Sequence, residues 1–324
     1  MNYGVVAITG GTGSLGKEVL RHLISPQTKE IRVFSRSERT QYFLRSQFEH
    51  PNLKWILGDI RNLYSLQKAF SGVDLVIHTA AMKQVPLCET NVLECIETNV
   101  IGTQLVAQAC HLERVKKLVA LSTDKAANPQ SVYGYSKLLG ERLIVEASNG
   151  NLETVAVRFG NLLGSDGSVI DLFIRQALAD KTLTVTDPCM TRFFVPIKDA
   201  AAIVLALAEP GRSGVAAYGG FKSSLLGLVD GFRSAWKDLC GEELGLKTIP
   251  VRPGERQHEE ILNDREEAAR AWQEDIDGMM VWRLGGAPTG NLPNTDNFKS
   301  STGDKVDPAW FAELLKPLIA ARLR

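Results

Sequence analysis

The sequence feature that most constrains the fold is a glycine-rich turn that directly follows a short apolar run near the N-terminus. Residues 4–9 (Gly-Val-Val-Ala-Ile-Thr) are nearly continuously apolar, which predicts a strand buried on both faces. Residues 10–16 (Gly-Gly-Thr-Gly-Ser-Leu-Gly) space their glycines for a tight turn and for close backbone approach to a pyrophosphate, and a helix is expected to continue to about Ile24. A glycine-rich turn without a ligand is the alternative. The strand before and the helix after favour a dinucleotide site with contacts from Gly10, Thr12, Gly13, Ser14, Leu15 and Gly16.

Further apolar runs alternate with helical patterns along the first half of the chain. Strands are predicted at residues 31–35, 54–57, 74–79, 118–121 and 153–159, and a helix is predicted at about 92–111. This alternation predicts an α/β fold with a Rossmann-type, doubly wound parallel sheet.

The pattern changes after Gly160. Helices are predicted at residues 170–179, 200–208 and 308–322, whereas 164–168 and 187–193 are predicted loops and 252–259 is a dense polar turn. We therefore expect an NADP-binding Rossmann domain over residues 1–164 and a smaller substrate-binding portion over residues 165–324, interleaved with the first.

Charge and composition exclude several kinds of partner. The formal net charge of the 324 residues is zero, so neither nucleic acid nor an acidic membrane surface is expected to bind. Neither a membrane-spanning run nor a signal-peptide pattern is present in the sequence. The five cysteines include no Cys-x-x-Cys pair, which predicts reduced thiols in a cytoplasmic protein and no metal site.

Three more strand ends are predicted to contact the cofactor. The second strand ends in Ser35-Arg36, where an NAD-preferring site usually carries an acid; this pair suits a 2′-phosphate, so NADP is favoured, with NAD and a merely solvated arginine as open alternatives. After the third strand, Asp59 could accept from an adenine amino group or simply cap the next helix. His78, in the fourth strand, is interpreted as a packed core histidine. The remaining expected cofactor contacts are Ile60, Ala80, Ala81 and Met82.

Four polar residues follow the strand predicted at 118–121. Ser122, Thr123, Asp124 and Lys125 would lie at its carboxyl end, where open α/β sheets bind their ligands. A surface ion pair between Asp124 and Lys125 is the alternative to a catalytic role.

A helix is expected to begin close to Val132, and it carries a candidate base. Tyr133 and Lys137 are four residues apart and share one face of that helix. A nearby ammonium favours the ionised phenol, which allows a tyrosine to accept a proton near neutral pH. Tyr135 lies on a different face and is the poorer candidate.

Seven motifs together resemble the extended short-chain dehydrogenases/reductases, and more narrowly the C5-inverting UDP-N-acetylglucosamine 4,6-dehydratases of pseudaminic acid biosynthesis. Thr-Asp-Lys with a tyrosine eight residues after the lysine is the specific feature: retaining hexose 4,6-dehydratases typically have Thr-Asp-Glu, and related dehydratase/5-epimerases often replace the tyrosine by methionine. The resemblance covers most of residues 4–262. The matching stretches are residues 9–16, 80–86, 122–129, 133–137, 158–161, 186–193 and 252–255.

The resemblance implies a reaction and a role for each residue. Tyr133, assisted by Lys137, would deprotonate the sugar C4 hydroxyl while hydride passes to the nicotinamide, which later returns it to C6. Lys125 would remove the C5 proton, protonated Asp124 would give its proton to the departing C6 hydroxyl, and Thr123 would orient the substrate. Lys125 must then be neutral, so burial or a cation such as Lys137 is expected to lower its pKa.

The same resemblance implies a UDP-sugar substrate and a homo-oligomer. Arginines on separate loops suit the UDP pyrophosphate, because their planar forks bind phosphate oxygens. Two residues depart from the family pattern beside the expected pocket: Asp166 stands where arginine is common, and Cys189 replaces a polar residue. The expected substrate contacts are Lys83, Asn161, Ile170, Arg192, Arg252 and Glu255.

Two other functions stay open. One is a retaining 4,6-dehydratase or a 4-epimerase acting on another nucleotide sugar. The other is a catalytically silent NADP-sensing regulator, which would have no need of Asp124, Lys125, Tyr133 and Lys137 together.

Overall fold

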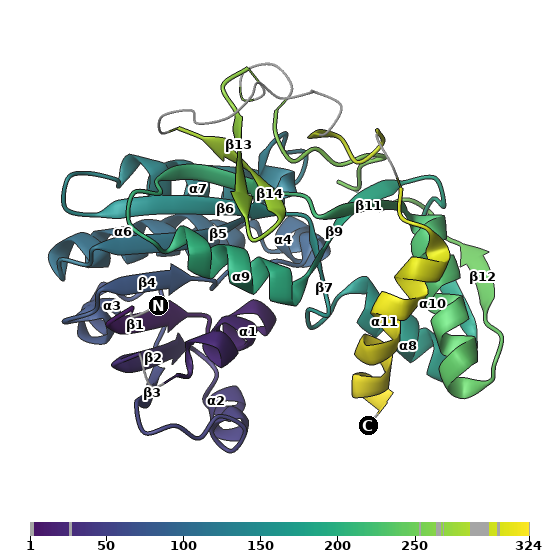
Figure 1. The fold of residues 1–324 in the computed structure, drawn as a ribbon, viewed down its shortest axis with the longest axis horizontal. Coiled ribbons are helices and arrows are strands. Elements are labelled where there is room, and N and C mark those ends of the chain that lie inside the picture. Colours follow the sequence, from purple (N-terminus) through teal and green to yellow (C-terminus); the bar gives the residue numbers. More distant parts are fainter. Residues whose placement is uncertain are drawn as a thin grey trace.

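The computed structural model describes residues 3–25, 28–252, 254–263, 267, 269–285, 298–302 and 305–323. Within these residues, nine strands form a central sheet in the order β13-β14-β10-β6-β5-β4-β1-β2-β3 (Figure 1). From β10 to β3 all neighbours are parallel, whereas β14 is antiparallel to both β10 and β13. The strands are β1 (Val5–Thr9), β2 (Glu30–Ser35), β3 (Leu53–Leu57), β4 (Leu75–His78), β5 (Lys117–Thr123), β6 (Glu153–Phe159), β10 (Gly214–Tyr218), β13 (Trp272–Ile276) and β14 (Met279–Leu284).

The predicted doubly wound α/β fold is confirmed. The strand order reverses between β1 and β4, which is the place where such sheets bind ligands at the carboxyl ends of their strands. One face is covered by α1 (Ser14–Leu23), α2 (Glu38–Arg45) and α9 (Ile197–Leu207), and the other by α3 (Leu63–Phe70), α6 (Gly102–Leu112) and α7 (Val132–Glu146) (Figure 1). Each helix turns its apolar stripe to the sheet, so the core consists of two apolar layers.

The helix expected over residues 92–111 is interrupted. After α4 (Val85–Thr90) come α5 (Val92–Ile96), a π-helical turn over Glu97–Ile101, and then α6. Within the turn, Asn99 accepts from the Met82 amide at 2.8 Å and donates to the Met82 carbonyl at 2.9 Å. A π-helical turn holds one residue more than an α-helical turn. Here it contains Asn99, whose side chain ties the helix to the segment after β4.

A second group of elements packs beside the sheet. It contains α8 (Val169–Ala179), α10 (Leu225–Cys240) and α11 (Pro308–Leu323), whose apolar side chains share one core (Figure 1). Two small sheets accompany them, ordered β11-β9-β7 and β12-β8. Their strands are β7 (Asn161–Leu163), β8 (Thr182–Val185), β9 (Thr191–Pro196), β11 (Phe221–Ser224) and β12 (Gly245–Thr248).

In this second half one sequence prediction is wrong and three strands were not predicted. The predicted loop over 187–193 ends early, because Thr191 already pairs with β11 as the first residue of β9. The sheet also gains β10, β13 and β14, none of which was predicted. β10 is a short segment whose place is fixed by its pairing with β6, over 50 residues earlier in the chain.

Candidate active site

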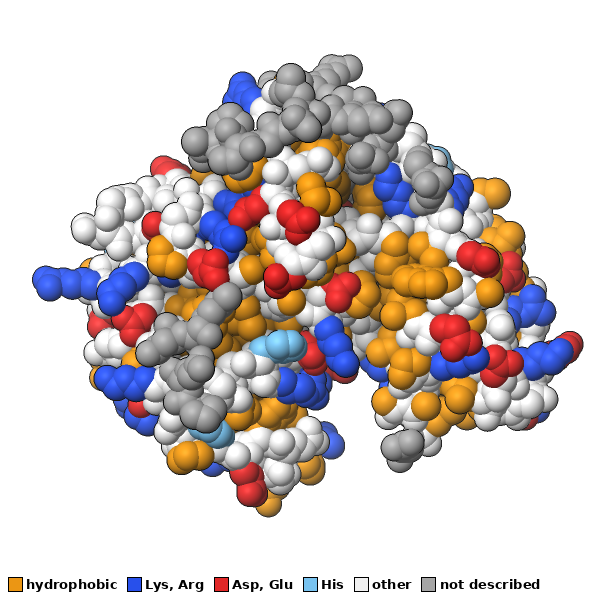
Figure 2. All heavy atoms as spheres, viewed as in Figure 1, with side chains coloured by type: hydrophobic (Ala, Val, Ile, Leu, Met, Phe, Trp, Pro, Cys, Tyr) orange, Lys and Arg blue, Asp and Glu red, His pale blue; other side chains and the backbone are white. Residues whose placement is uncertain are grey.

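A cavity of about 930 Å³ lies where the sheet meets the second group of elements. Its walls combine the glycine-rich turn after β1 with residues of α8, such as Val169 and Leu172. Figure 2 shows this face of the molecule hollowed between the part that carries α1 and α2 and the part that carries α8 and α11. The cavity therefore opens at the carboxyl ends of the parallel strands, as predicted for this sheet.

The glycine-rich turn is shaped for a close ligand. Gly10 has φ +68°, and a Cβ there would stand 2.6 Å from the Ala80 amide nitrogen, while a Cβ on Gly16 would stand 2.6 Å from the Gly11 Cα. Gly13 caps α1 without a side-chain acceptor, so the first amides of the helix face the cavity uncapped. The residues predicted to contact the cofactor here, Gly10, Thr12, Gly13, Ser14, Leu15 and Gly16, all line the cavity.

The end of the cavity formed by β2 and β3 contains the residues predicted to bind the adenosine half. Ser35, Arg36 and Ile60 line it, but Asp59 does not. Burial raises the pKa of Asp59, yet hydrogen bonds from Arg61, one of them at 2.8 Å, outweigh it and lower that pKa. Asp59 is therefore engaged by Arg61, and the Arg36 side chain, which is 54% exposed, also approaches Asp59 and Glu94 at 3.8 Å.

At the end of β4, Ala80, Ala81 and Lys83 line the cavity, whereas Met82 lies behind its wall. The backbone of Met82 is fixed by Asn99, as described above. Lys83 donates to the Asp166 carbonyl at 2.7 Å, which joins this segment to the loop before α8.

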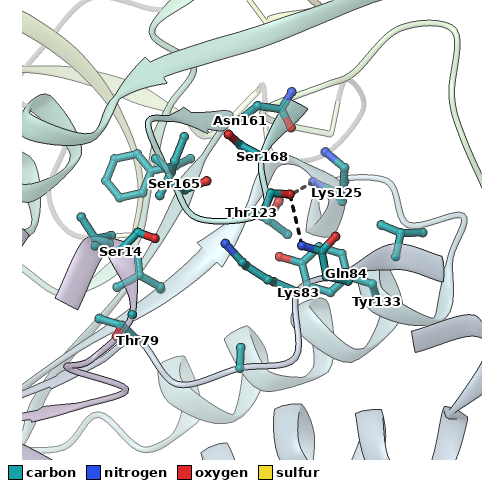
Figure 3. A pocket seen from close by; sticks show the side chains of 18 of the residues that line it. Ser14, Thr79, Lys83, Gln84, Thr123, Lys125, Tyr133, Asn161, Ser165 and Ser168 are labelled. Carbon is teal, nitrogen blue, oxygen red and sulfur yellow. Dashed lines mark hydrogen bonds between the residues drawn. The ribbon is translucent and has the colours of Figure 1, made fainter. Parts of the chain in front are cut away.

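The centre of the site is formed by the end of β5 and the start of α7. Lys125 Nζ lies 3.0 Å from Asp124 Oδ1 and 3.4 Å from Glu259 Oε1. The Thr123 hydroxyl donates to the same Asp124 oxygen at 2.9 Å. Thr123, Lys125 and Tyr133 lie together on one side of the cavity, opposite Ser14 and Thr79 (Figure 3). Asp124 is fully buried behind them and does not line the cavity.

The charge state of Lys125 differs from the expectation. Burial lowers the pKa of the Lys125 amine, but the carboxylates of Asp124 and Glu259 outweigh it and hold that pKa well above its usual range. Lys125 is therefore an ammonium in the free protein.

Tyr133 and Lys137 also behave differently from the sequence interpretation. Burial raises the pKa of Tyr133 to about 12, although Lys125 and a hydrogen bond with Thr123 act in the opposite direction. Lys137 turns its ammonium to the Leu121 carbonyl at 2.5 Å, and burial lowers the pKa of Lys137 to about 8. In the free protein, the nearby cation that favours the Tyr133 phenolate is thus Lys125.

Most of the expected substrate contacts reach the cavity. Lys83, Asn161, Arg192, Arg252 and Glu255 line it. Ile170 is fully buried in the core beneath α8 and does not. Because α8 turns through 100° per residue, its neighbours Val169 and Leu172 face the cavity instead.

The two departures from the family pattern lie in different surroundings. Asp166 pairs with Lys17 of α1 at 3.1 Å, and its amide donates to the Ser14 hydroxyl at 2.7 Å, so its loop bridges to the glycine-rich turn. Cys189 is exposed, with its amide bonded to the Asp187 carboxylate at 2.8 Å.

Three buried polar residues beside the site were missed by sequence reasoning. Glu259 contacts Lys125, Asn99 ties Met82 and Ser136, and Glu141 accepts from Ser122 of β5 at 2.8 Å. Glu259 ends the dense polar turn of residues 252–259, which was the available signal. Nothing local in the sequence distinguishes Asn99 and Glu141 from exposed helix residues.

The doubly wound sheet, the glycine cradle at its switch point and the tyrosine and lysine of α7 define a Rossmann-type protein of the extended short-chain dehydrogenase/reductase class. The family model described as polysaccharide biosynthesis protein matches residues 6–281. The chain belongs to this polysaccharide biosynthesis family.

Individual relatives agree with this assignment. The chain is 40% identical over 279 residues to a protein of Rickettsia felis named UDP-glucose 4-epimerase, covering 84% of this chain and 80% of the relative. It is 32% identical to Pen from Bacillus thuringiensis, whose X-ray structure superposes with a TM-score of 0.89 over 97% of this chain and 98% of the other. The dTDP-glucose 4,6-dehydratase DesIV from Streptomyces venezuelae, solved with NAD, is 24% identical with a TM-score of 0.68 over 78% of this chain and 86% of the other, a likeness of fold.

Proposed function

We propose that the protein is a nucleotide-sugar 4,6-dehydratase that converts UDP-N-acetylglucosamine, with inversion at C5, to UDP-2-acetamido-2,6-dideoxy-β-L-arabino-hexos-4-ulose. The observation that carries this proposal is the Asp124–Lys125 pair, 3.0 Å apart, beside Tyr133 at the switch point of the sheet. Dehydration across C5 and C6 needs a base for the C5 proton and an acid for the departing C6 hydroxyl, besides the group that deprotonates the C4 hydroxyl. Lys125, Asp124 and Tyr133 are the candidates for these three roles.

The residues of the chain supply the proton transfers. Tyr133 accepts the C4 hydroxyl proton in its phenolate form. The Lys125 ammonium favours that form, because it lowers the pKa of Tyr133 against the effect of burial. Lys125 removes the C5 proton, which the C4 ketone has made acidic. A nicotinamide dinucleotide in the glycine cradle would supply the chemistry of taking hydride from C4 and returning it to C6.

The acid is assigned to Asp124. Its Oδ1 accepts from Thr123 and Lys125, while its Oδ2 is buried without a hydrogen-bond partner. Asp124 acts in its protonated form, through the Thr123 hydroxyl that contacts its Oδ1 and lines the cavity: Thr123 gives its proton to the departing C6 hydroxyl and accepts the proton of Asp124 in return.

The cofactor is assigned as NADP. Ser35 and Arg36 line the end of the cavity where the adenosine ribose would lie, and no acid lines the cavity at this end among the described residues. Several neighbours of known structure, among them DesIV, were solved with NAD, so NAD is the competing cofactor. For the UDP-sugar, the cavity also offers Lys83, Arg192 and Arg252, with Asn161 and Glu255.

A UDP-glucose 4-epimerase is the second candidate, because the relatives at about 40% identity carry that name. A 4-epimerase removes and returns hydride at C4 alone, so it needs Tyr133 but neither a C5 base nor a C6 acid. The Asp124–Lys125 pair therefore favours dehydration.

Proton NMR in deuterated water distinguishes the two reactions. The purified protein is given UDP-N-acetylglucosamine or UDP-glucose without added cofactor. A 4-keto-6-deoxy product with deuterium at C5 and L-arabino couplings supports the proposal, and the D-xylo product would remove the inversion. Conversion of UDP-glucose to UDP-galactose without C5 deuterium would establish the epimerase instead, and no turnover with NADP still bound would favour a silent sensor.

We also propose that the protein self-associates and works in the cytoplasm. Apolar side chains are exposed on adjacent helices: Leu87 of α4, Leu93 and Ile96 of α5, and Leu139 of α7 are between 40 and 69% exposed. A second copy of the chain would cover them, which sedimentation of Leu93→Glu against the unsubstituted protein tests. All five cysteines are free, which suits a reducing compartment, and no helix among the described residues is long and apolar enough to cross a membrane.

A further inference from the structure

Glu259 is a buried carboxyl group that the proposed reaction does not yet use. It is 2% exposed, and its backbone is held by Ser300, which accepts from the Glu259 amide at 2.8 Å and donates to its carbonyl at 2.9 Å. Glu259 Oε1 lies 3.4 Å from Lys125 Nζ, and Oε2 is enclosed without a hydrogen-bond partner. The side chain is therefore fixed in place with one oxygen toward Lys125 and the other unpaired.

Lys125 lies between two buried carboxyl groups, those of Asp124 and Glu259. Asp124 offers it Oδ1 at 3.0 Å and keeps Oδ2 buried and unpaired, just as Glu259 does with its two oxygens. In the resting protein two buried carboxylates therefore share the Lys125 ammonium, and Arg192 Nε also lies 3.8 Å from Glu259 Oε1. A proton placed on either unpaired oxygen would remove a buried negative charge, so the cluster has a place to receive one.

The surrounding charges make Glu259 the better acceptor of that proton. Burial raises the pKa of Glu259, the Asp124 carboxylate raises it further, and Lys125, Arg192 and Arg256 oppose these effects without cancelling them. On the Lys125 side, Asp124 and Glu259 hold the proton on the amine and Arg192 disfavours it. The Lys125 charge also acts on Tyr133 of α7, where it lowers the pKa against the larger effect of burial.

The resting charge state raises a chemical problem for the proposed function, on which this inference rests. An ammonium cannot remove the sugar C5 proton, and Lys125 is expected to be an ammonium in the resting protein because its Nζ lies 3.0 Å from Asp124 Oδ1 and 3.4 Å from Glu259 Oε1. We propose that Glu259 controls the protonation of Lys125, holding it as an ammonium in the resting protein and accepting its proton when substrate is bound.

The step balances within the site. An N–H bond of Lys125 breaks, the nitrogen keeps the electron pair, and Glu259 gains an O–H bond. The C5–H bond then breaks, its electron pair moves toward the C4 ketone, and the Lys125 nitrogen regains a proton. Glu259 does not line the cavity, so it is a positioning residue that acts through Lys125.

Glu259→Gln tests the role, with Glu260→Gln as the matched control. Glu260 is the next residue and also a partly enclosed carboxylate, but it lies 3.8 Å from Arg256 and 3.9 Å from Lys299. We expect kcat for dehydration, measured by NMR, to fall at least ~100-fold in E259Q with KM unchanged, as for loss of a proton-transfer group. E260Q is expected to stay within about 3-fold, and Glu259→Asp to recover part of the loss.

Acylation of Lys125 gives a second measurement that needs no turnover. The protein is treated with acetic anhydride across pH 7 to 11, and acetyl-Lys125 is followed by peptide mass spectrometry. Removing the Glu259 charge lowers the pKa of Lys125, so the E259Q profile moves to lower pH while that of E260Q stays in place. Glu259→Asp should shift the acylation profile less, in the same direction. This variant serves as the test if E259Q does not fold.

The two measurements together decide the inference. More reactive Lys125 with lost turnover supports it, because a merely electrostatic Glu259 would make E259Q the faster enzyme at neutral pH. Retained or faster turnover in E259Q, or an unchanged acylation profile, overturns it. If the unsubstituted protein fails to convert UDP-N-acetylglucosamine, the proposed function fails, and the acylation profiles still decide whether Glu259 controls Lys125.

Discussion

Tyr133 and Tyr135 are neighbours on one helix with opposite surroundings. Tyr133 lines the cavity and contacts Thr123, whereas Tyr135 is 55% exposed. Substituting each tyrosine in turn therefore distinguishes the loss of a phenol at the site from the loss of any hydroxyl on α7.

Tyr133→Phe is expected to lower kcat by roughly 10²–10⁴-fold, because the group that accepts the C4 hydroxyl proton is lost. Tyr135→Phe is the control and should remain within about 2-fold of the unsubstituted protein. NMR of product formation measures both, and a loss below 3-fold in Tyr133→Phe would remove the tyrosine from the mechanism.

Arg36 and Arg39 provide a similar comparison for the cofactor. Arg36 lines the cavity, while the Arg39 guanidinium stands 5.8 Å from the centre of the Phe43 ring. Arg36→Ala should weaken NADP binding about 10-fold through the lost contact with a 2′-phosphate, and leave NAD within about 2-fold. Arg39→Ala should change neither. Calorimetric titration with both cofactors checks this, and equal losses for NADP and NAD would disprove a 2′-phosphate site at Arg36.

At the scale of elements, a buried ion network joins the sheet to α7. Arg158 of β6 is fully buried; it donates to Glu141 of α7 at 2.6 Å and to Glu267 at 2.5 and 2.9 Å. Glu141 also accepts from Ser122, on the strand that ends at the site. The network therefore fixes α7, and with it Tyr133 and Lys137, against β5 and β6.

Arg158→Met should reduce the free energy of unfolding by roughly 3–5 kcal/mol, because two carboxylates would lose their buried partner. Arg142→Met is the control: this arginine also approaches Glu267, at 3.7 Å, but is 65% exposed, so a change within about 0.5 kcal/mol is expected. Urea unfolding measures both, and a cost below about 1 kcal/mol for Arg158→Met would show that the network contributes little.

At the scale of the whole molecule, His78 makes stability depend on pH. His78 accepts from the Thr9 hydroxyl at 2.6 Å and donates to the Thr103 hydroxyl at 3.1 Å. The Thr103 oxygen can accept this bond because its own hydroxyl proton is donated to the Asn99 carbonyl. Complete burial, together with the nearby positive charge of Lys137, lowers the pKa of His78 to about 3. The histidine that joins β4, β1 and α6 is therefore neutral.

Acidification should weaken the fold through this residue. Between pH 6.5 and 3 the unfolded chain binds a proton at His78 that the folded protein does not, so stability falls as the pH falls. From pH 7 to 5.5 the expected loss from this group is about 1 kcal/mol. His78→Gln cannot titrate, and its unfolding free energy should fall by that much less over the same interval. Equal pH dependence in the two proteins would contradict the assignment.

The parts of the fold that the sequence predicted are those with a local pattern. The first six strands and the glycine cradle follow from apolar runs and glycine spacing. The helix that was predicted to begin close to Val132 starts at that residue. Parallel strands in a doubly wound sheet must end on the same edge. The meeting of residues 10–16 with residues 123–125 and Tyr133 was therefore already contained in the order of the motifs.

Tertiary structure alone decided the strand pairing of β10, the burial of Ile170 and the arrival of Glu259 beside Lys125. It also decided the direction in which the pKa values of Lys125 and Tyr133 move. Helices and strands form from neighbours in the sequence. Side-chain burial and charge instead depend on groups that come together from distant parts of the chain, as Lys125 and Glu259 do.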